Sequence, residues 1–367
     1  MRDKHPYFGV RFDRWMKDLL TYGITRSQLH KYKNITKFSG KLTPLALYES
    51  ALYQRRVAKT DLAASPIFLL GHWRSGTTHL QNLLTLDPQW AYLNTIQSIF
   101  PGLMITQEEN LKKLLPAQKR YMDDVKISGS TPSEEEISMA TLAQGSFWNG
   151  YFFTKDMDYY FNKYVLFDGI TQKEYRNWKG MYHFLMQKIQ FVNPGKQLVL
   201  KNPPNTARVK MLLELYPDAK FVFISRNPVE VYLSRLAQYD TAVKSKDLQN
   251  MTKDEWESKL LRYYPLMMNK YLDERDLIPK GNLVEITFES LKADPLDTLS
   301  EVYSGLNLGG FSQAVKIFKE YIAAQRDYKQ NSYDIAPEVL DKVSRHWGKY
   351  QEIFGYDTKP VKAKQVA

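Results

Sequence analysis

Residues 66–80, PIFLLGHWRSGTTHL, form an apolar run that breaks into a loop punctuated by glycines and then opens a helical stretch. A short apolar run bounded by glycine is typical of a buried strand. Gly71 and Gly76 permit backbone conformations and close approach that a side chain would obstruct. The amides that begin the following helix direct their N–H groups at an anion. The segment therefore predicts a P-loop-like strand–loop–helix unit that binds a phosphate-like group.

Three later runs are also short, apolar and rich in β-branched or aromatic residues: Gln197–Leu200, Phe221–Ser225 and Leu283–Thr287. Helical periodicity covers residues 208–216 between the runs Gln197–Leu200 and Phe221–Ser225, and residues 229–238 after Phe221–Ser225. Alternating strands and helices imply right-handed crossovers. We therefore predict an α/β fold, a single domain whose central parallel sheet is flanked by helices on both faces.

Ligands of such sheets bind at the carboxyl ends of the strands. The glycine loop, the segment KNPPN (residues 201–205) and the segment SRNP (residues 225–228) each follow a predicted strand. The topology therefore predicts an active site built from these three loops.

An ATP-dependent P-loop kinase is one alternative, but its loop carries a lysine where this chain has Thr77. Here the cation lies inside the loop, at Arg74. Such enzymes also end another strand with an acid for magnesium, whereas these strands end in Lys201 and in Ser225 followed by Arg226. The pattern favours a multiply anionic donor held without metal, and a 5′ phosphosulfate with a separate 3′ phosphate would use both basic loops.

At these segments the chain resembles the sulfotransferases that use 3′-phosphoadenosine 5′-phosphosulfate (PAPS), in their broad bacterial branch. GHWRSGTTHL is similar to the family's 5′-phosphosulfate loop, FVFISRNPVEVYLSRL resembles its 3′-phosphate motif, and LVLKNPP resembles its Leu-Lys-x-Pro segment. TFESLKADP and WGKYQEIFGY are similar too, so the resemblance spans residues 65–357. It implies transfer of a sulfonate group to a hydroxyl by metal-independent in-line displacement.

The resemblance also implies the donor-binding residues. Arg226 and Ser234 would hold the 3′ phosphate, and the glycine loop would hold the phosphosulfate. The full predicted set is Gly71, Arg74, Ser75, Gly76, Thr77, Thr78, Arg226 and Ser234.

Transfer requires cations on the sulfonyl and leaving oxygens and a base for the acceptor proton. Arg74 and Lys201 meet the first requirement, although the same residues could be a surface ion pair and a solvated strand end. For the base, the resemblance points to the acids in TPSEEEISMA, with Glu134 first and Glu135 second. Acids at a helix start also have a purely stabilising role there.

Two further residues bear on the base. In TPSEEEISMA, Ser133 and Glu136 have the spacing of a capping box, which gives Glu136 a structural explanation. His79 is a third candidate base, with packing as its alternative role. Relatives often carry a histidine where this chain has Asn205, which cannot act as a base.

Residues 146–164, SFWNGYFFTKDMDYYFNKY, are crowded with aromatics. Such density is typical of a core or a covering flap, but it also suits an apolar hydroxylated acceptor such as a sterol, lipid or phenol. A sugar could stack on the same rings.

The first 60 residues carry 13 Lys and Arg against 4 acids, a net charge of +9. Phe8, Phe12, Trp15 and Leu19 recur there at helical spacing. We predict a basic amphipathic helical leader over residues 1–60 packed on the same domain as residues 61–367, the sulfotransferase domain. The alternative is a helix whose residues 8–20 make a peripheral contact with anionic lipid.

The chain has no cysteine, and MRDKHPYFGV has no apolar stretch of the kind that begins a signal peptide. These features predict a cytoplasmic protein, or one peripheral at the membrane, with a small-molecule partner. No nucleic-acid-binding module is recognisable. A third hypothesis is a non-catalytic module that binds anions or membranes.

Overall fold

The computed structural model describes residues 5–113, 115–119, 126–143, 145–324 and 335–356. Its centre is a five-stranded sheet in which every pairing is parallel. The spatial order is β2 (Trp90–Ala91), β5 (Gln197–Lys201), β1 (Ile67–Leu70), β6 (Lys220–Ser225) and β7 (Leu283–Thr287). The α/β prediction and its four strands are confirmed, and within this sheet the two-residue β2 is the strand that was not predicted. A separate antiparallel pair joins β3 (Gln118–Lys119) to β4 (Lys126–Ile127).

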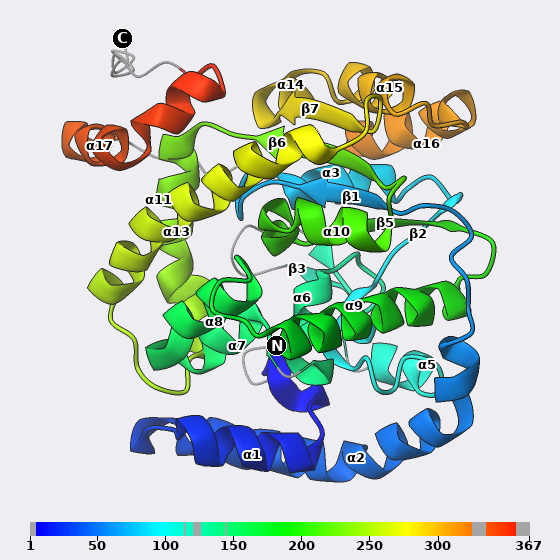
Figure 1. The fold of residues 1–367 in the computed structure, drawn as a ribbon, viewed down its shortest axis with the longest axis vertical. Helices are drawn as coiled ribbons and strands as arrows, with labels where there is room; N and C mark the ends of the chain where they lie inside the picture. Colours follow the sequence, from blue (N-terminus) through cyan, green and yellow to red (C-terminus); the bar gives the residue numbers. More distant parts are fainter. Residues whose placement is uncertain (1–4, 114, 120–125, 144, 325–334, 357–367) are drawn as a thin grey trace.

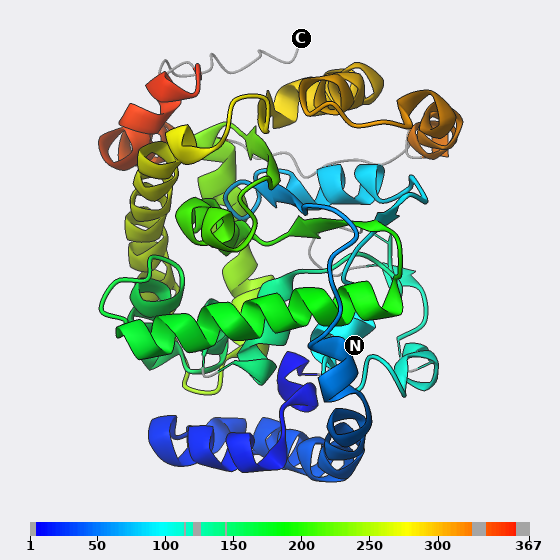
Figure 2. The same ribbon diagram turned by 45° about the vertical axis from the view of Figure 1, so that its right-hand side comes forward.

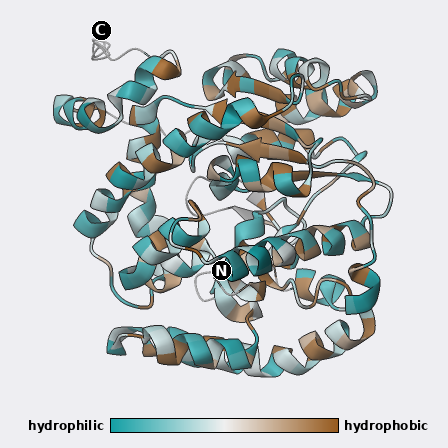
Figure 3. Cartoon of the chain, in the orientation of Figure 1, coloured by the Kyte–Doolittle hydropathy of each residue, from teal (hydrophilic) through white to brown (hydrophobic). Residues whose placement is uncertain are grey.

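Alternate residues of the central strands enter two different cores, as the period of two in a strand requires. Phe68 of β1 and Phe221 of β6 lie in the larger core, whereas Leu69 and Val222 lie in the smaller one. Because both faces of the sheet are covered, the strands read as continuous apolar runs, and Figure 3 shows hydrophobic residues concentrated in them.

Helices cover both faces of the sheet, with α14–α16 and α3 above it and α9 and α10 below it in Figure 1. The bounds that matter for the site are α3 (Thr77–Leu84), α6 (Glu135–Leu142), α7 (Phe147–Phe152), α8 (Met157–Tyr164), α9 (Gln172–Val192), η4 (Pro203–Ala207), α10 (Val209–Leu215) and α11 (Pro228–Gln238). Helices later in the chain include α13 (Lys253–Glu274), α14 (Phe288–Ala293), α15 (Pro295–Gly305), α16 (Phe311–Ala324) and α17 (Pro337–Ile353). The predicted helices at 208–216 and 229–238 correspond to α10 and α11.

The N-terminal residues form η1 (Pro6–Gly9), α1 (Phe12–Tyr22), η2 (Arg26–Gln28) and the long α2 (Leu29–Val57). These helices lie along the lower edge of the molecule in both ribbon views (Figures 1 and 2). The helix expected across residues 8–20 begins only at Phe12, because a turn led by Pro6 precedes it. Phe8 and Trp15 are buried in the larger core, so these two side chains pack on the protein itself.

A buried ion pair fastens α2 to the rest of the protein. Lys188 Nζ of α9 lies 2.7 Å from Glu49 Oε1, and both side chains are almost fully buried. The second oxygen, Glu49 Oε2, accepts hydrogen bonds from the backbone N–H groups of Ile105 and Thr106. Within the described part of the chain, none of the helices combines the length and apolarity needed to cross a bilayer.

Candidate active site

The loop after β1 has the compact shape that its glycines predict. Gly71 and Gly76 have φ values of 146° and 104°. A Cβ at Gly71 would lie 2.6 Å from the Ile224 carbonyl oxygen, and one at Gly76 would lie 2.4 Å from the Phe288 ring. Side chains are therefore excluded at both positions by conformation and by space. Gly76 is the N-cap of α3, so the first amides of this helix are directed into the loop.

Two buried hydroxyl groups lie in this loop, on Ser75 and Thr77. Ser75 Oγ has no hydrogen-bond partner among the described residues. A buried hydroxyl without a partner costs free energy, and a phosphate oxygen in the loop would supply the missing bond. The loop therefore fits an anionic group. Thr78 follows as the second residue of α3, half-buried.

The three residues expected to hold the donor's charges come together. Arg74 Nε donates a hydrogen bond to Ser234 Oγ of α11 at 2.8 Å, and Arg226 Nη1 donates to the Arg74 carbonyl oxygen at 3.1 Å. Arg226 follows β6 directly and is buried, with its guanidinium 4.5 Å above the Phe288 ring. The predicted 5′ and 3′ sites are therefore adjacent parts of one basic cluster at the carboxyl ends of β1 and β6.

An internal carboxylate already occupies part of this cluster. Arg226 Nε donates to Glu230 Oε2 at 3.0 Å, and Nη2 contacts the same oxygen. The two residues are four positions apart, and Glu230 is partly exposed whereas Arg226 is buried. A phosphate that approached Arg226 would compete with Glu230 for the same N–H groups.

At the end of β5, Lys201 is in contact with both candidate bases. Lys201 Nζ lies 2.7 Å from Glu134 Oε1, and the Lys201 backbone N–H donates to Glu135 Oε1 at 3.1 Å. The Glu134 side chain is 20% exposed, whereas Glu135 is fully buried. Burial raises the pKa of Glu135 to about 8, although the neighbouring Lys201 charge acts in the opposite direction. The two carboxyl groups therefore differ in burial and in the atom of Lys201 that they contact.

The capping box expected from Ser133 and Glu136 is wrong. The N-cap of α6 is Glu134, with no side-chain capping bond, and Ser133 Oγ lies 2.8 Å from Ser98 Oγ. Glu136 instead pairs with the fully buried Arg208, at 2.7 Å from Nη1 and 3.0 Å from Nη2. Glu136 therefore forms a buried ion pair and does not cap the start of the helix, contrary to the prediction from its spacing in the sequence.

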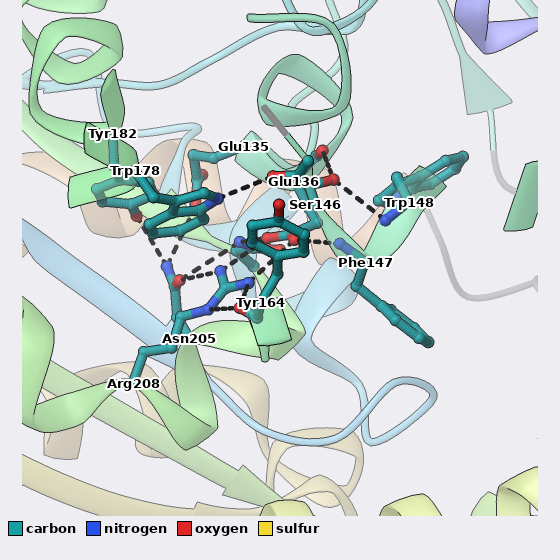
Figure 4. A network of polar contacts seen from close by, with 12 residues as sticks. Glu135, Glu136, Ser146, Phe147, Trp148, Tyr164, Trp178, Tyr182, Asn205 and Arg208 are labelled. Atoms are coloured by element: carbon teal, nitrogen blue, oxygen red, sulfur yellow. Dashed lines mark hydrogen bonds and ion pairs between the residues drawn. The ribbon is translucent and has the colours of Figure 1, made fainter. Parts of the chain in front are cut away.

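Figure 4 shows the network around this ion pair. Glu136 also accepts hydrogen bonds from the Phe147 N–H and from Asn202 Nδ2. Asn205 Nδ2 donates to Tyr182 and, at 3.4 Å, to Glu135. The network joins α6 to the segment 202–208 and so sets the position of the acids relative to Lys201. Sequence reasoning missed Arg208, and only its place three residues after KNPPN could have drawn attention to it.

Comparisons with known proteins agree with this geometry. A sequence model of the family described as "Sulfotransferase family" matches residues 66–313, which include the three loops of the site. The chain belongs to the sulfotransferase family. It is therefore an enzyme of this PAPS-dependent family, and the alternatives of a P-loop kinase and of a non-catalytic module do not hold.

Among curated relatives of this sulfotransferase is the omega-hydroxy-beta-dihydromenaquinone-9 sulfotransferase Stf3 of Mycobacterium bovis. The two are 30% identical over 355 residues, which cover 96% of this chain and 91% of the relative. Sulfotransferase STF1 of Mycobacterium tuberculosis shares the fold with a TM-score of 0.62 and 17% identity, over 93% of this chain and 94% of the other. Sulfotransferase STF9 of Mycobacterium avium has a TM-score of 0.64 at 14% identity, over 95% and 97% of the chains.

Other predicted residues of the sulfotransferase site have less distinctive surroundings. His79 lies in the first turn of α3, half-buried, and burial lowers its pKa. In the aromatic segment 146–164 most rings are buried in the larger core, among them Phe147, Phe152 and Phe161. The interpretation of this segment as core is confirmed for these rings.

The raised pKa of Glu135 predicts a pH dependence of stability. Its ordinary value is 4.5 and its folded value about 8, so the folded sulfotransferase retains a proton that the unfolded chain releases. The protonated Glu135 carboxyl therefore contributes to the stability of the folded protein. This contribution is fully present below pH 4.5 and is lost as the pH rises through about 8. Between pH 4.5 and about 8 the free energy of unfolding should therefore fall in the unmodified protein, and it should fall less in Glu135→Gln. Denaturant titration at several pH values measures both. An equal fall in both proteins would contradict the assignment.

Proposed function

We propose that this sulfotransferase transfers the sulfonyl group of PAPS to a hydroxyl group of a small apolar acceptor. The observation that carries the proposal is the adjacency of Arg74, Ser234 and Arg226, with Lys201 and Glu134 at the neighbouring strand end. Arg74, Ser234 and Arg226 suit a donor that carries a 5′ phosphosulfate and a 3′ phosphate. Glu134 suits removal of the acceptor proton, with the Lys201 cation beside it.

Donor binding is assigned to the two basic loops. Ser75 Oγ and the amides of residues 75–78 would hold the 5′ phosphosulfate, and Arg226 with Ser234 would hold the 3′ phosphate. When bound, PAPS supplies the sulfonyl group, whose sulfur–oxygen bond to the 5′ phosphate breaks as the acceptor oxygen bonds to sulfur. Arg74 bonds to Ser234 through its side chain and to Arg226 through its backbone carbonyl. At this position its charge stabilises the anion that develops during transfer.

Glu134 is the proposed base and Lys201 its partner. Glu134 is partly exposed and paired with a cation, so its carboxylate is accessible to a bound hydroxyl. Glu135 is fully buried with a raised pKa, which favours a positioning role through the Lys201 backbone. Lys201 is assigned to the leaving and sulfonyl oxygens, and His79 is the remaining candidate for the base.

The acceptor is proposed to be a hydroxylated lipid, sterol or phenol. Support comes from the relative in Mycobacterium bovis, whose name specifies a hydroxylated menaquinone. A peripheral membrane contact through residues 8–20 would suit such acceptors, and Phe12 and Leu20 of this stretch are exposed.

An acceptor screen with radiolabelled PAPS tests this function directly. Lipid quinols, sterols, phenols and sugars would be offered in parallel, with adenosine 3′,5′-bisphosphate binding measured in the absence of magnesium. We expect labelled product from an apolar alcohol or phenol. Transfer only to sugars would overturn the acceptor class, and failure of the bisphosphate to bind would overturn the donor.

Arg226→Ala is expected to weaken bisphosphate binding by about 1.5–3 kcal/mol, the range for a hydrogen bond to a charged group. Glu230→Gln is its matched opposite, because it removes the carboxylate that contacts Arg226 Nε and should tighten binding several-fold. Isothermal titration calorimetry measures both. Equal affinity in all three proteins would remove Arg226 from the site.

A further inference from the structure

Exposed large apolar side chains gather on one layer of the molecule. Among the described residues, eight of the thirteen exposed large hydrophobic side chains belong to α1 and α2. They include Leu20, Tyr48 and Leu52, with 82%, 59% and 49% of their surface exposed. Single exposed apolar residues are ordinary, but a concentration on one face marks a contact with a membrane or a partner.

On α2 these side chains form a stripe. Phe38, Leu45, Tyr48 and Leu52 follow each other at intervals of seven, three and four residues, which places them on one side of a helix. Phe12 and Leu20 of α1 are exposed as well, so both helices of this layer carry exposed apolar side chains. Other residues of α2 face the protein: Ile35, Leu42, Ala46 and Val57.

The same stripe carries positive charge. Lys41 and Arg55 continue its helical spacing, and Lys37 lies beside them; all three are exposed. Residues 5–60 contain eleven Lys and Arg but only three acids, Asp13, Asp18 and Glu49.

None of the three acids offsets this charge. Asp18 and Glu49 are buried, and Asp13 pairs with Arg11 at 3.0 Å. The exposed face therefore combines apolar side chains with an excess of cations.

We propose that the outward face of α1 and α2 binds the surface of an anionic lipid bilayer. An amphipathic helix that lies in a membrane interface has this composition, with apolar side chains for the acyl boundary and Lys and Arg for the headgroups. Both helices run along one edge of the molecule in Figures 1 and 2, and Figure 3 shows hydrophobic and hydrophilic residues interspersed along α2. The apolar contact extends well beyond residues 8–20, and its main element is α2.

The layer of α1 and α2 is connected to the helix that begins with the acids of the active site. The turn η1 contacts α2 and also α6, and α6 begins at Glu135 with Glu134 as its N-cap. The lipid contact is separate from the donor site, so its test does not depend on sulfonyl transfer.

The test is flotation of the full chain with vesicles of phosphatidylcholine alone or mixed with phosphatidylglycerol. We expect binding to the anionic vesicles that weakens with added salt. The variant Tyr48→Ser/Leu52→Ser should reduce the partition coefficient about tenfold or more, because it removes exposed apolar area from the contact. Lys41→Glu/Arg55→Glu should reduce it by a similar factor.

Matched controls are Leu277→Ser, whose side chain is 54% exposed in another part of the structure, and Lys280→Glu. Both should bind vesicles as the unmodified protein does, and all variants should bind the bisphosphate equally. Absence of binding to anionic vesicles, or equal loss in stripe and control variants, would overturn the proposal. A dimer that dissociates in Tyr48→Ser/Leu52→Ser, seen by light scattering, would assign the face to a second copy of the chain instead.

Discussion

Glu134→Gln is expected to lower turnover about a hundredfold or more while it leaves bisphosphate affinity unchanged. The amide cannot accept the acceptor proton, and general-base catalysis contributes on the order of 10²–10⁴ to rate. Lys201, 2.7 Å from the carboxylate, remains in place to hold the donor. Single-turnover kinetics with saturating PAPS would measure the chemical step, and calorimetry would measure the affinity.

Glu135→Gln is the comparison variant that distinguishes a general base from a positioning residue. The buried Glu135 carboxyl, with its pKa near 8, is mostly protonated at neutral pH, so a neutral amide changes its charge little. We expect a loss below about tenfold, in the range of a positioning residue rather than a base. A larger loss in Glu135→Gln than in Glu134→Gln would transfer the role to Glu135, and full activity in both would leave His79 as the candidate.

Arg208→Ala is expected to destabilise the protein by about 3–5 kcal/mol, the cost of leaving one partner of a buried ion pair alone. Both side chains of the Arg208–Glu136 pair are fully buried. The guanidinium also donates from Nε to the Tyr164 carbonyl oxygen at 2.9 Å and lies 4.5 Å from the Trp178 ring. Denaturant titration would measure the change as a shift of the unfolding midpoint.

The double variant Arg208→Met/Glu136→Gln separates charge from packing. Methionine fills part of the vacated volume, and glutamine still accepts the Phe147 N–H, which lies 2.9 Å from Glu136 Oε1. Because neither variant residue is charged, we expect a smaller loss of stability than in Arg208→Ala. If the two proteins lose equally, the ion pair itself is not the cause.

Much of the fold could be predicted because the central strands are buried on both sides. Ile67–Leu70 and Phe221–Ser225 are continuous apolar runs, and their length and flanking residues distinguish them from helices. β2 has only two residues, Trp90 and Ala91, so it has no pattern of its own and exists through pairing with β5.

The loops of the site could be located from sequence for a related reason: each comes directly after a predicted strand. The partners of their side chains could not. Glu136 has the spacing of a capping residue, yet it bonds with Arg208, 72 positions away, and Arg226 Nη1 donates to the carbonyl oxygen of Arg74, 152 positions away. Local spacing describes neighbours within one helix, whereas these contacts depend on the tertiary fold.

The backbone of the glycine loop carries one further consequence. Arg74 has a φ of 72°, a conformation that costs a residue with a Cβ on the order of 1 kcal/mol or more and that glycine adopts freely. A laboratory selection for heat resistance alone would thus favour glycine at position 74, and the selected variants would melt at a higher temperature but lose the guanidinium that bonds with Ser234. Stability and the proposed chemistry make opposite demands on this one residue, and the chain has arginine there.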